Sequence, residues 1–254
     1  MDYDALLNTS TQIGYMLLAN GAEIYRVEES MNRILHAYGA ADCGVFVVPS
    51  SIMISITTKN GHTISKIKRV PCHTTNLTKV ERLNDLCRRT CKQTPAFAQV
   101  QQELMRIDNL LPFPYWLQLL AYALVAFSFT LFYGGRLAEA VCALLCGLST
   151  KVIVSSMARF RTNPFFINIS ASAVIAIIAL FMVHLGVATQ ADKIIIGGLM
   201  NLVPGIAITN FMRDIMAGDM FAGLTKLTES LLTATAIALG AGIAITIARA
   251  LWGV

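Results

Sequence analysis

The sequence predicts an α-helical integral membrane protein with five transmembrane helices, preceded by a small cytosolic α+β domain. The first observation is composition: the 254-residue chain is 55% hydrophobic and 14% charged, with a mean hydropathy of +0.60. Soluble proteins contain about 45–50% apolar and about 25% charged residues. The second observation is distribution, because residues 1–112 hold most of the charge and residues 113–254 are nearly continuous apolar runs. We therefore assign a cytosolic domain to 1–112 and a transmembrane domain to 113–254.

Helices open and close the cytosolic domain. Apolar residues recur at spacings near three and four across residues 4–38, which predicts helix. Asn20-Gly21 interrupts this pattern and divides it into two helices. Near the end of the domain, Asn76 or Thr78 is positioned to cap a helix that reaches about Cys91, and a last helix covers about 95–110.

Strand patterns lie between these helices. Residues 45–48 are rich in β-forming types, and isoleucines alternate with Met53, Ser55 and Thr57 over residues 52–57. Lys59-Asn60-Gly61-His62 supplies a hairpin turn, so 63–70 is the return strand. The domain is thus expected to hold helices beside a short antiparallel sheet.

The second half contains five apolar segments of about 20 residues, the length that a helix needs to cross the hydrocarbon core. These cover about 114–133, 137–157, 165–186, 193–212 and 227–250. Basic residues favour a cytosolic N-terminus and an external C-terminus in the cytoplasmic (cell) membrane. On that topology the inner loops hold Arg106, Arg159, Arg161, Arg213 and Lys226, and the outer side holds Arg136, Lys193 and Arg249.

The fourth segment carries a Pro204-Gly205 pair and several polar side chains, which a simple anchor would not need. In a regular helix Gly197, Asn201, Gly205 and Thr209 would form one small, polar row. Such a row serves either close helix packing or the wall of a cavity for a polar solute. The Pro204-Gly205 break favours the cavity, because packing does not require a break.

Ionisable residues near the membrane are candidates for gating or proton coupling. Arg213 and Asp214 close the fourth segment, and Glu229, Glu139 and His184 lie near the ends of other segments. We predict no metal site: Cys87 and Cys91, like Cys142 and Cys146, are four residues apart, but a zinc site takes about four ligands. The net charge of +5 contains no block of like charges, so no nucleic acid partner is expected.

A charged motif, Gly21–Ser30, lies in the predicted cytosolic domain, and its Glu23, Arg26 and Glu28 are candidate functional residues. Glu23 and Arg26 are three apart, and Glu29 and Arg33 are four apart, which also suits an exposed ladder of helix salt bridges. No nucleophile elbow, phosphate loop, dinucleotide glycine pattern or zinc-protease motif occurs, so no cofactor and no catalytic residue are predicted.

Two of these segments resemble the signatures of the threonine/serine exporter family. Gly21–Glu29 with Met31–Ile34 is similar to the family's opening motif, and Val203–Asp214 with Gly218-Asp219 is similar to its membrane motif. The resemblance implies a cytosolic domain joined to a five-span half of a ten-span exporter that drives threonine and serine out by the proton motive force. It implies family roles for Glu23, Arg26, Glu28, Pro204, Gly205, Asn210, Arg213 and Asp214.

A chain of five spans is similar to the split members of that family, in which a second, shorter membrane protein supplies the remaining spans. Some split pairs are linked to export of dicarboxylates such as succinate. The expected partners are therefore a second small membrane subunit, a further copy of the chain, or both, together with a small polar solute. In this transporter Asn201, Pro204, Gly205, Thr209 and Asn210 would line the transport path.

Two other functions remain open from the sequence. In one, the α+β domain is an enzyme tethered to the membrane, with a hydrolase-like activity that the family resemblance does not exclude. In the other, the chain is a regulatory or assembly subunit whose soluble domain senses a metabolite.

Overall fold

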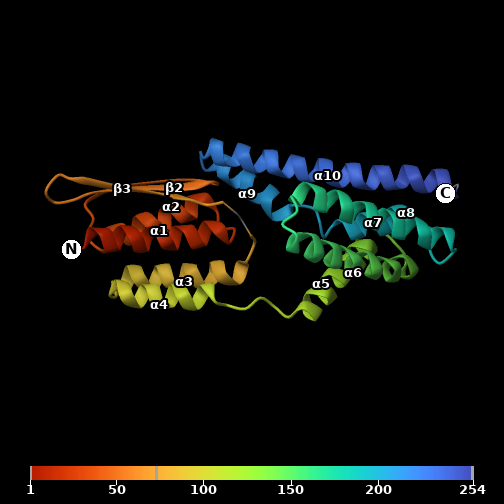
Figure 1. The fold of residues 1–254 in the computed structure, drawn as a ribbon, viewed down its shortest axis with the longest axis horizontal. Coiled ribbons are helices and arrows are strands. Elements are labelled where there is room, and N and C mark those ends of the chain that lie inside the picture. The colour runs from red at the N-terminus through yellow and green to blue at the C-terminus, as the bar shows by residue number, and fades with distance from the viewer. Residues whose placement is uncertain (1, 72–73, 253–254) are drawn as a thin grey trace. The chain divides into compact units, whose positions relative to one another are not determined.

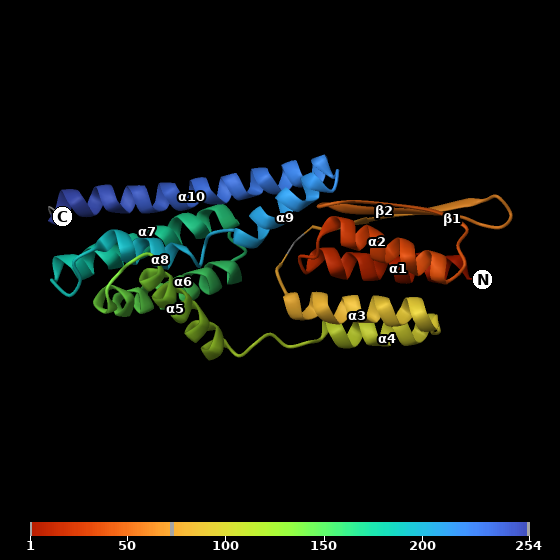
Figure 2. The same ribbon diagram turned by 180° about the vertical axis from the view of Figure 1, so that it is seen from behind.

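The computed structural model describes residues 2–71 and 74–252 and forms two compact units. The first comprises Met1–Leu111 and, from much later in the chain, Thr209–Leu227; the second comprises Pro112–Ile208 and Thr228–Val254. The first unit thus includes a segment that the sequence pattern placed in the membrane half. Figures 1 and 2 together label the helices and strands.

The first unit begins with helices α1 (Tyr3–Ala19) and α2 (Ile24–Ala37). The Asp2 side chain accepts a hydrogen bond from the Ala5 N–H at 2.9 Å and caps α1. α1 ends at Asn20, and Gly21 follows with a φ of +92°, a backbone conformation that glycine adopts without strain. The predicted break at Asn20-Gly21 is therefore present.

Three strands, β1 (Asp42–Val48), β2 (Ser51–Thr57) and β3 (Thr63–Arg69), form an antiparallel sheet in the order β1-β2-β3. The isoleucines of β2 are buried under the helices, as their alternation predicts. The opposite face carries the cross-strand row Phe46, Met53 and Ile67, all of which are exposed.

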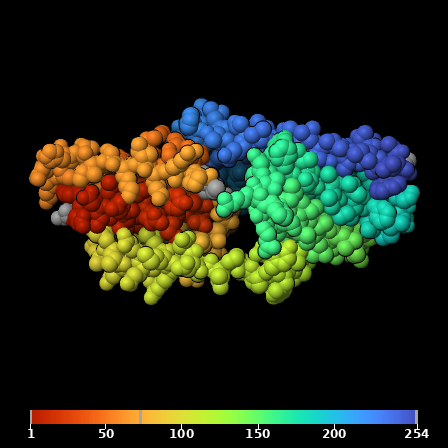
Figure 3. Space-filling view, in the orientation of Figure 1, coloured from red at the N-terminus to blue at the C-terminus, as the bar shows by residue number. Residues whose placement is uncertain are grey.

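α3 (Leu77–Gln93) and α4 (Phe97–Asp108) complete this part of the unit. The Asn76 side chain accepts from the Lys79 N–H and caps α3, which selects Asn76 over Thr78 as the cap. In the space-filling view α1 lies between the orange strand layer and the yellow layer of α3 and α4 (Figure 3).

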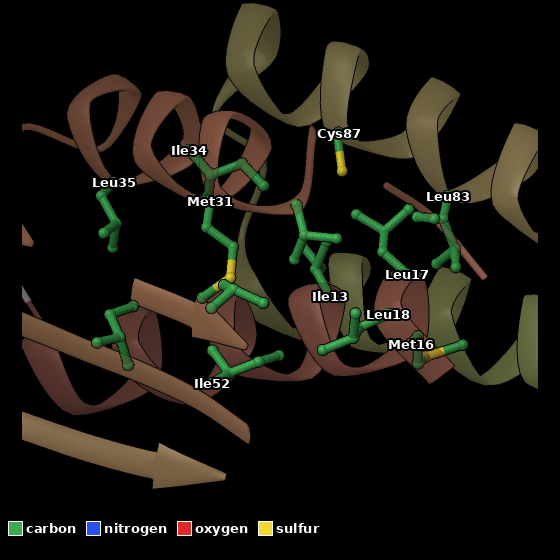
Figure 4. Close-up of a cluster of buried hydrophobic side chains, with 14 of the residues drawn as sticks. Ile13, Met16, Leu17, Leu18, Met31, Ile34, Leu35, Ile52, Leu83 and Cys87 are labelled. Carbon is green, nitrogen blue, oxygen red and sulfur yellow. The ribbon is translucent and has the colours of Figure 1, made fainter. Parts of the chain in front are cut away.

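One hydrophobic core joins the three layers of the first unit. α1 and α2 contact the sheet on one side, and α3 contacts both helices on the other. Figure 4 shows buried side chains from all of these elements meeting; the labelled ones are Ile13, Met16, Leu17, Leu18, Met31, Ile34, Leu35, Ile52, Leu83 and Cys87. Ala222, from the distant segment of the unit, is buried in the same core.

The second unit contains α5 (Tyr115–Phe132), α6 (Leu137–Arg159), α7 (Pro164–His184) and the short α8 (Ala191–Leu199), visible from behind in Figure 2. Its core is made largely of alanines, cysteines and isoleucines, and its larger apolar side chains point outward. Small residues at helix contacts and large ones outside are typical of helices packed in a bilayer.

Four helices of the described chain have the length and hydropathy of a membrane span: α5, α6, α7 and α10 (Met220–Trp252). The predicted segments 114–133, 137–157, 165–186 and 227–250 fall within or close to them. The expected span at 193–212 is not one helix, because it consists of α8, an irregular stretch and α9 (Gly205–Met216). Pro204 has no N–H to bond the Met200 carbonyl, which accounts for the interruption. Four of the five expected transmembrane helices are therefore present as helices long and apolar enough to cross a membrane, and the remaining segment is interrupted, as its Pro204-Gly205 pair predicts.

Candidate functional site

The two charged motifs, far apart in sequence, meet within the first unit. The Arg213 guanidinium of α9 donates a hydrogen bond to Glu23 Oε1 at the amino end of α2. Glu23 Oε2 lies 2.8 Å from Arg26 Nε, and the Glu23 side chain is only 13% exposed. One nearly buried carboxylate is thus held between two guanidinium groups, at a helix end where the dipole favours negative charge.

Asp214 forms a second ion pair, with α10 rather than with α2. Its Oδ2 accepts a hydrogen bond from Lys226 Nζ at 2.6 Å, and the Asp214 side chain is fully buried. Asp214 Oδ1 has no hydrogen-bond partner within the described ranges. Arg213 and Asp214 were predicted to act together as a gate; they are neighbours in sequence but bind different partners.

The turn between α9 and α10 holds these pairs in place. Gly218 has a φ of +99°, and the Asp219 N–H bonds the Asp214 carbonyl at 2.9 Å. Gly223 of α10 faces α9 closely, because a Cβ at this position would lie 3.1 Å from the Phe211 carbonyl. The amino end of α10 therefore packs on α9 as a tight helical hairpin, which brings Lys226 to Asp214.

Glu28 links α2 to the sheet. It accepts a hydrogen bond from the Val47 N–H at 2.7 Å. Burial raises the pKa of this carboxyl above its ordinary 4.5; the Val47 hydrogen bond opposes that shift, and the negative charge of Asp219 adds to it. Glu28 and Asp219, one from each motif, are thus close enough to repel one another.

We expect Glu28→Gln to stabilise the protein, and increasingly so as the pH rises. Because folding raises the pKa of Glu28, its charged form is disfavoured in the folded state; the penalty is absent below pH 4.5 and complete above the raised pKa. Glutamine keeps an oxygen that can accept from Val47. Thermal unfolding of both proteins between pH 4 and pH 8 measures the difference, and a gain that shrinks with pH would contradict this account.

The irregular stretch after α8 belongs to the second unit. The Asn201 side-chain amide donates to the Tyr122 carbonyl of α5 at 3.1 Å, so α5 anchors the end of α8. Gly197, one turn earlier, lies against the α5 backbone: a Cβ there would come within 2.9 Å of the Ala126 carbonyl and 2.8 Å of the Thr130 nitrogen. Close packing therefore explains Gly197.

The predicted row of small residues does not continue past the break. Gly205 starts α9, and a Cβ built on it would meet nothing within 4 Å. Thr209 and Asn210 lie in the part of α9 that belongs to the first unit, where Thr209 is exposed and Asn210 half-buried. The four residues share a helix face only if the helix is continuous, and Pro204 prevents that.

Gly197→Ala is expected to destabilise the protein and Gly205→Ala to leave it unchanged or slightly more stable. The added methyl at 197 must displace α5 backbone, which costs about 1–3 kcal/mol for an overpacked site. At 205 the methyl meets open space, and replacing glycine lowers the conformational entropy of the unfolded chain, which stabilises the folded state by about 0.4–1 kcal/mol. Thermal unfolding of the two variants in the same detergent compares them, and equal shifts would contradict the close contact at Gly197.

The other predicted coupling residues have separate surroundings. Glu139 is buried at the amino end of α6, where it accepts from the Arg136 N–H at 2.9 Å and from both the N–H and the hydroxyl of Thr189. It thereby ties α6 to the segment before α8. His184 stacks on Trp252 with ring centroids 5.8 Å apart, and Glu229 is exposed on α10.

Lys226 and Tyr122 join the site although the sequence motifs do not include them. Lys226 lies beside the apolar segment 227–250, and a lysine at that position is the one signal for a partner of the buried Asp214. Tyr122 contributes a backbone carbonyl, for which the sequence holds no signal. Over residues 2–71 and 74–252, no three His, Cys, Asp or Glu side chains are grouped to hold a metal ion.

The chain is similar to a known protein family over most of its length, including both charged motifs. The profile of the family described as “Putative threonine/serine exporter” matches residues 8–248. A curated protein of Mycobacterium tuberculosis named “Probable threonine/serine exporter” is 20% identical over 237 residues, which is 92% of this chain and 45% of that protein. The chain therefore spans about half the length of the curated relative it matches. No solved structure matches the chain. With a family profile that covers nearly all of its length, the chain belongs to the threonine/serine exporter family.

Proposed function

We propose that the chain is part of a secondary exporter of small polar metabolites, with threonine and serine as the first candidates and the proton motive force as the driving energy. Family membership supports a transporter rather than an enzyme. The observation that carries the proposal furthest is the interruption between α8 and α9, in the only apolar segment of the second half that is not a continuous helix among the residues described.

The path of the chain supports a fifth crossing through this interrupted segment. If α5, α6 and α7 each cross the membrane, the end of α7 would lie on the side opposite the first unit. Thr209–Leu227 nevertheless belongs to the first unit. The residues between them must return across the bilayer, and about 20 residues are needed for that.

That crossing would run from the start of α8 to about Ile208, with its break at Met200–Pro204 near the middle. α8 has 9 residues, so alone it spans about 14 Å of a hydrocarbon core of about 30 Å. Backbone that is not helical is stable at such a depth only when it is buried in protein or lines a wet cavity. Interrupted helices of this kind form solute sites in many transporters.

In this proposal, five crossings put the C-terminus on the opposite side of the membrane from the first unit, and the basic residues of the loops favour the cytosolic side for the first unit. α10 has 33 residues and is about 50 Å long, more than a single crossing needs. Its first part belongs to the first unit, and its later part has the hydropathy of a span. In this proposal, a second set of spans completes the transport path, on a separate membrane subunit or another copy of the chain.

The tethered-enzyme alternative receives no support from the motif on which it depended. Glu23 and Arg26 are engaged with one another and with Arg213, and Glu28 binds the Val47 backbone. These contacts hold α2 to α9 and to the sheet. The motif therefore has a structural role, as a joint between these elements.

Efflux from the native host tests the proposal. Cells lacking the gene are complemented with the wild-type or a variant chain, loaded with labelled threonine, serine or succinate, and followed with and without a protonophore. Pro204→Ala and Asn201→Leu should abolish efflux while the protein remains in the membrane. Pro164→Ala is the matched control, because Pro164 is the first residue of α7, where a missing N–H costs nothing.

Efflux of threonine or serine that a protonophore stops would support the assignment. Faster efflux of succinate than of either amino acid would move the proposal to dicarboxylates. Unchanged efflux from both variants would remove the solute site from the break between α8 and α9.

A further inference from the structure

A groove between α2 and α3 in the first unit shares Arg26 with the ion pairs described so far. It encloses about 820 Å³ and is lined only by residues of these two helices. Ligand pockets generally measure about 300–1,000 Å³. The two helices start near one another. The N–H of Asn76, the residue before α3, donates to the carbonyl of Asn20, which lies in the turn that leads into α2. They therefore run in the same direction along the groove.

The far end of the groove is cationic. Arg33 of α2 and Arg88 and Lys92 of α3 gather around Cys87 and Cys91. Arg33 is paired with Glu29 at 2.5 Å. Neither Arg88 nor Lys92 forms an ion pair with any residue in the described ranges, so this end carries two uncompensated positive charges. Arginine and lysine in such a cluster favour phosphate or carboxylate groups.

The near end of the groove is aromatic and apolar. Tyr25, Leu77 and Val80 form its walls, and Leu77 is 61% exposed although it is a large apolar residue. The carboxylate of Glu81 also lines the groove, one helical turn after Leu77, which favours binding of the anionic part of a ligand at the far end. Arg26 lies 6.0 Å above the Tyr25 ring and donates to its hydroxyl at 3.1 Å. A flat ring can stack on such a surface, since tyrosine and arginine both present planar faces.

The two ends are separated by about two helical turns. Tyr25 and Arg33 are eight residues apart on α2, which corresponds to about 12 Å along the helix axis. A ligand that satisfies both ends therefore needs a planar, weakly polar part and an anionic part, joined by a linker of several atoms.

We propose that this groove binds a nucleoside phosphate, with the base beside Tyr25 and Leu77 and the phosphates beside Arg88 and Lys92. The site is independent of the proposed transport path. It is nevertheless connected to the joint between α2 and α9, because Arg26 both lines the groove and pairs with Glu23. A ligand that draws Arg26 into the groove leaves Glu23 to Arg213 alone.

Calorimetric titration of the full chain in a neutral detergent tests the site, with ADP as the probe. Adenosine, inorganic phosphate and succinate are titrated separately. ADP should bind at least about tenfold more tightly than any of these, because only ADP engages both ends of the groove. Binding should weaken as salt increases.

Variants locate the site. Arg88→Gln with Lys92→Gln should weaken ADP binding by at least about tenfold. Arg88→Gln alone should also weaken ADP binding, and Arg89→Gln is its matched control: each removes one positive charge from α3, but Arg89 pairs with Asp85 and does not line the groove. Tyr25→Leu should weaken binding of ADP and leave that of phosphate unchanged.

Absence of ADP binding at millimolar concentration would overturn the proposal. So would equal affinity for inorganic phosphate or succinate, because the aromatic end would then contribute nothing. An equal loss in Arg89→Gln would mean a general charge effect and would also overturn the site.

Discussion

Lys226→Met is expected to destabilise the protein more than Asp214→Asn, although the two residues form one ion pair. The difference lies in burial: Asp214 is fully buried, whereas the Lys226 side chain is 16% exposed. Removing the lysine leaves a carboxylate in the interior of the α9–α10 hairpin with one oxygen already lacking a hydrogen-bond partner in the described chain. Breaking a buried pair in this way costs about 3–5 kcal/mol. Removing the aspartate charge leaves a lysine that can reach water.

The double variant Asp214→Asn, Lys226→Met should recover part of the stability that Lys226→Met loses. With both charges gone, no uncompensated ion remains, and such replacements are often nearly neutral. Thermal unfolding midpoints of the four proteins in one detergent measure the order. Equal losses from the two single variants, or a double variant worse than Lys226→Met, would show that the pair is not held as the structure places it.

Local patterns predicted most of the elements of the first unit. The Asn76 cap, the Asn60-Gly61 turn and the break at Asn20-Gly21 each depend on residues a few positions apart, and all three are present. The pairs Glu23–Arg26 and Glu29–Arg33, expected from helical spacing, are present as well. Such features are visible in sequence because the backbone geometry of a helix or turn fixes which neighbours meet.

The contacts that define the candidate site could not be predicted in the same way. Glu23 and Arg213 are 190 residues apart, and no periodicity connects them. Hydropathy placed residues 193–212 in one span, whereas contacts assign Thr209 and the residues after it to the first unit. A hydropathy window averages over a break in a helix. It therefore cannot show that the residues before the break pack in one unit and the residues after it pack in the other.

The second large expected effect is a loss of efflux when the Glu23–Arg213 ion pair is removed. Arg213→Gln should reduce efflux from complemented host cells by at least about tenfold, equivalent to about 1.4 kcal/mol. In the proposed transporter, Arg213 holds α9, which directly follows the interrupted segment, to the first unit. The fold itself should tolerate the change, because Glu23 keeps Arg26 as a partner and Arg213 is 48% exposed. Exposed pairs contribute only about 0–1 kcal/mol to stability.

A double-variant cycle distinguishes this joint from a general loss of charge. Glu23→Gln should lower efflux as Arg213→Gln does, and the double variant should be no worse than either single one, since both remove the same contact. Arg213→Lys, which retains the charge, should keep part of the efflux. Arg106→Gln is the control, because Arg106 is 76% exposed and pairs only with Glu103 in the described structure. Additive losses from Glu23 and Arg213 would mean that the two residues act separately, and the link between α2 and α9 would then have no part in transport.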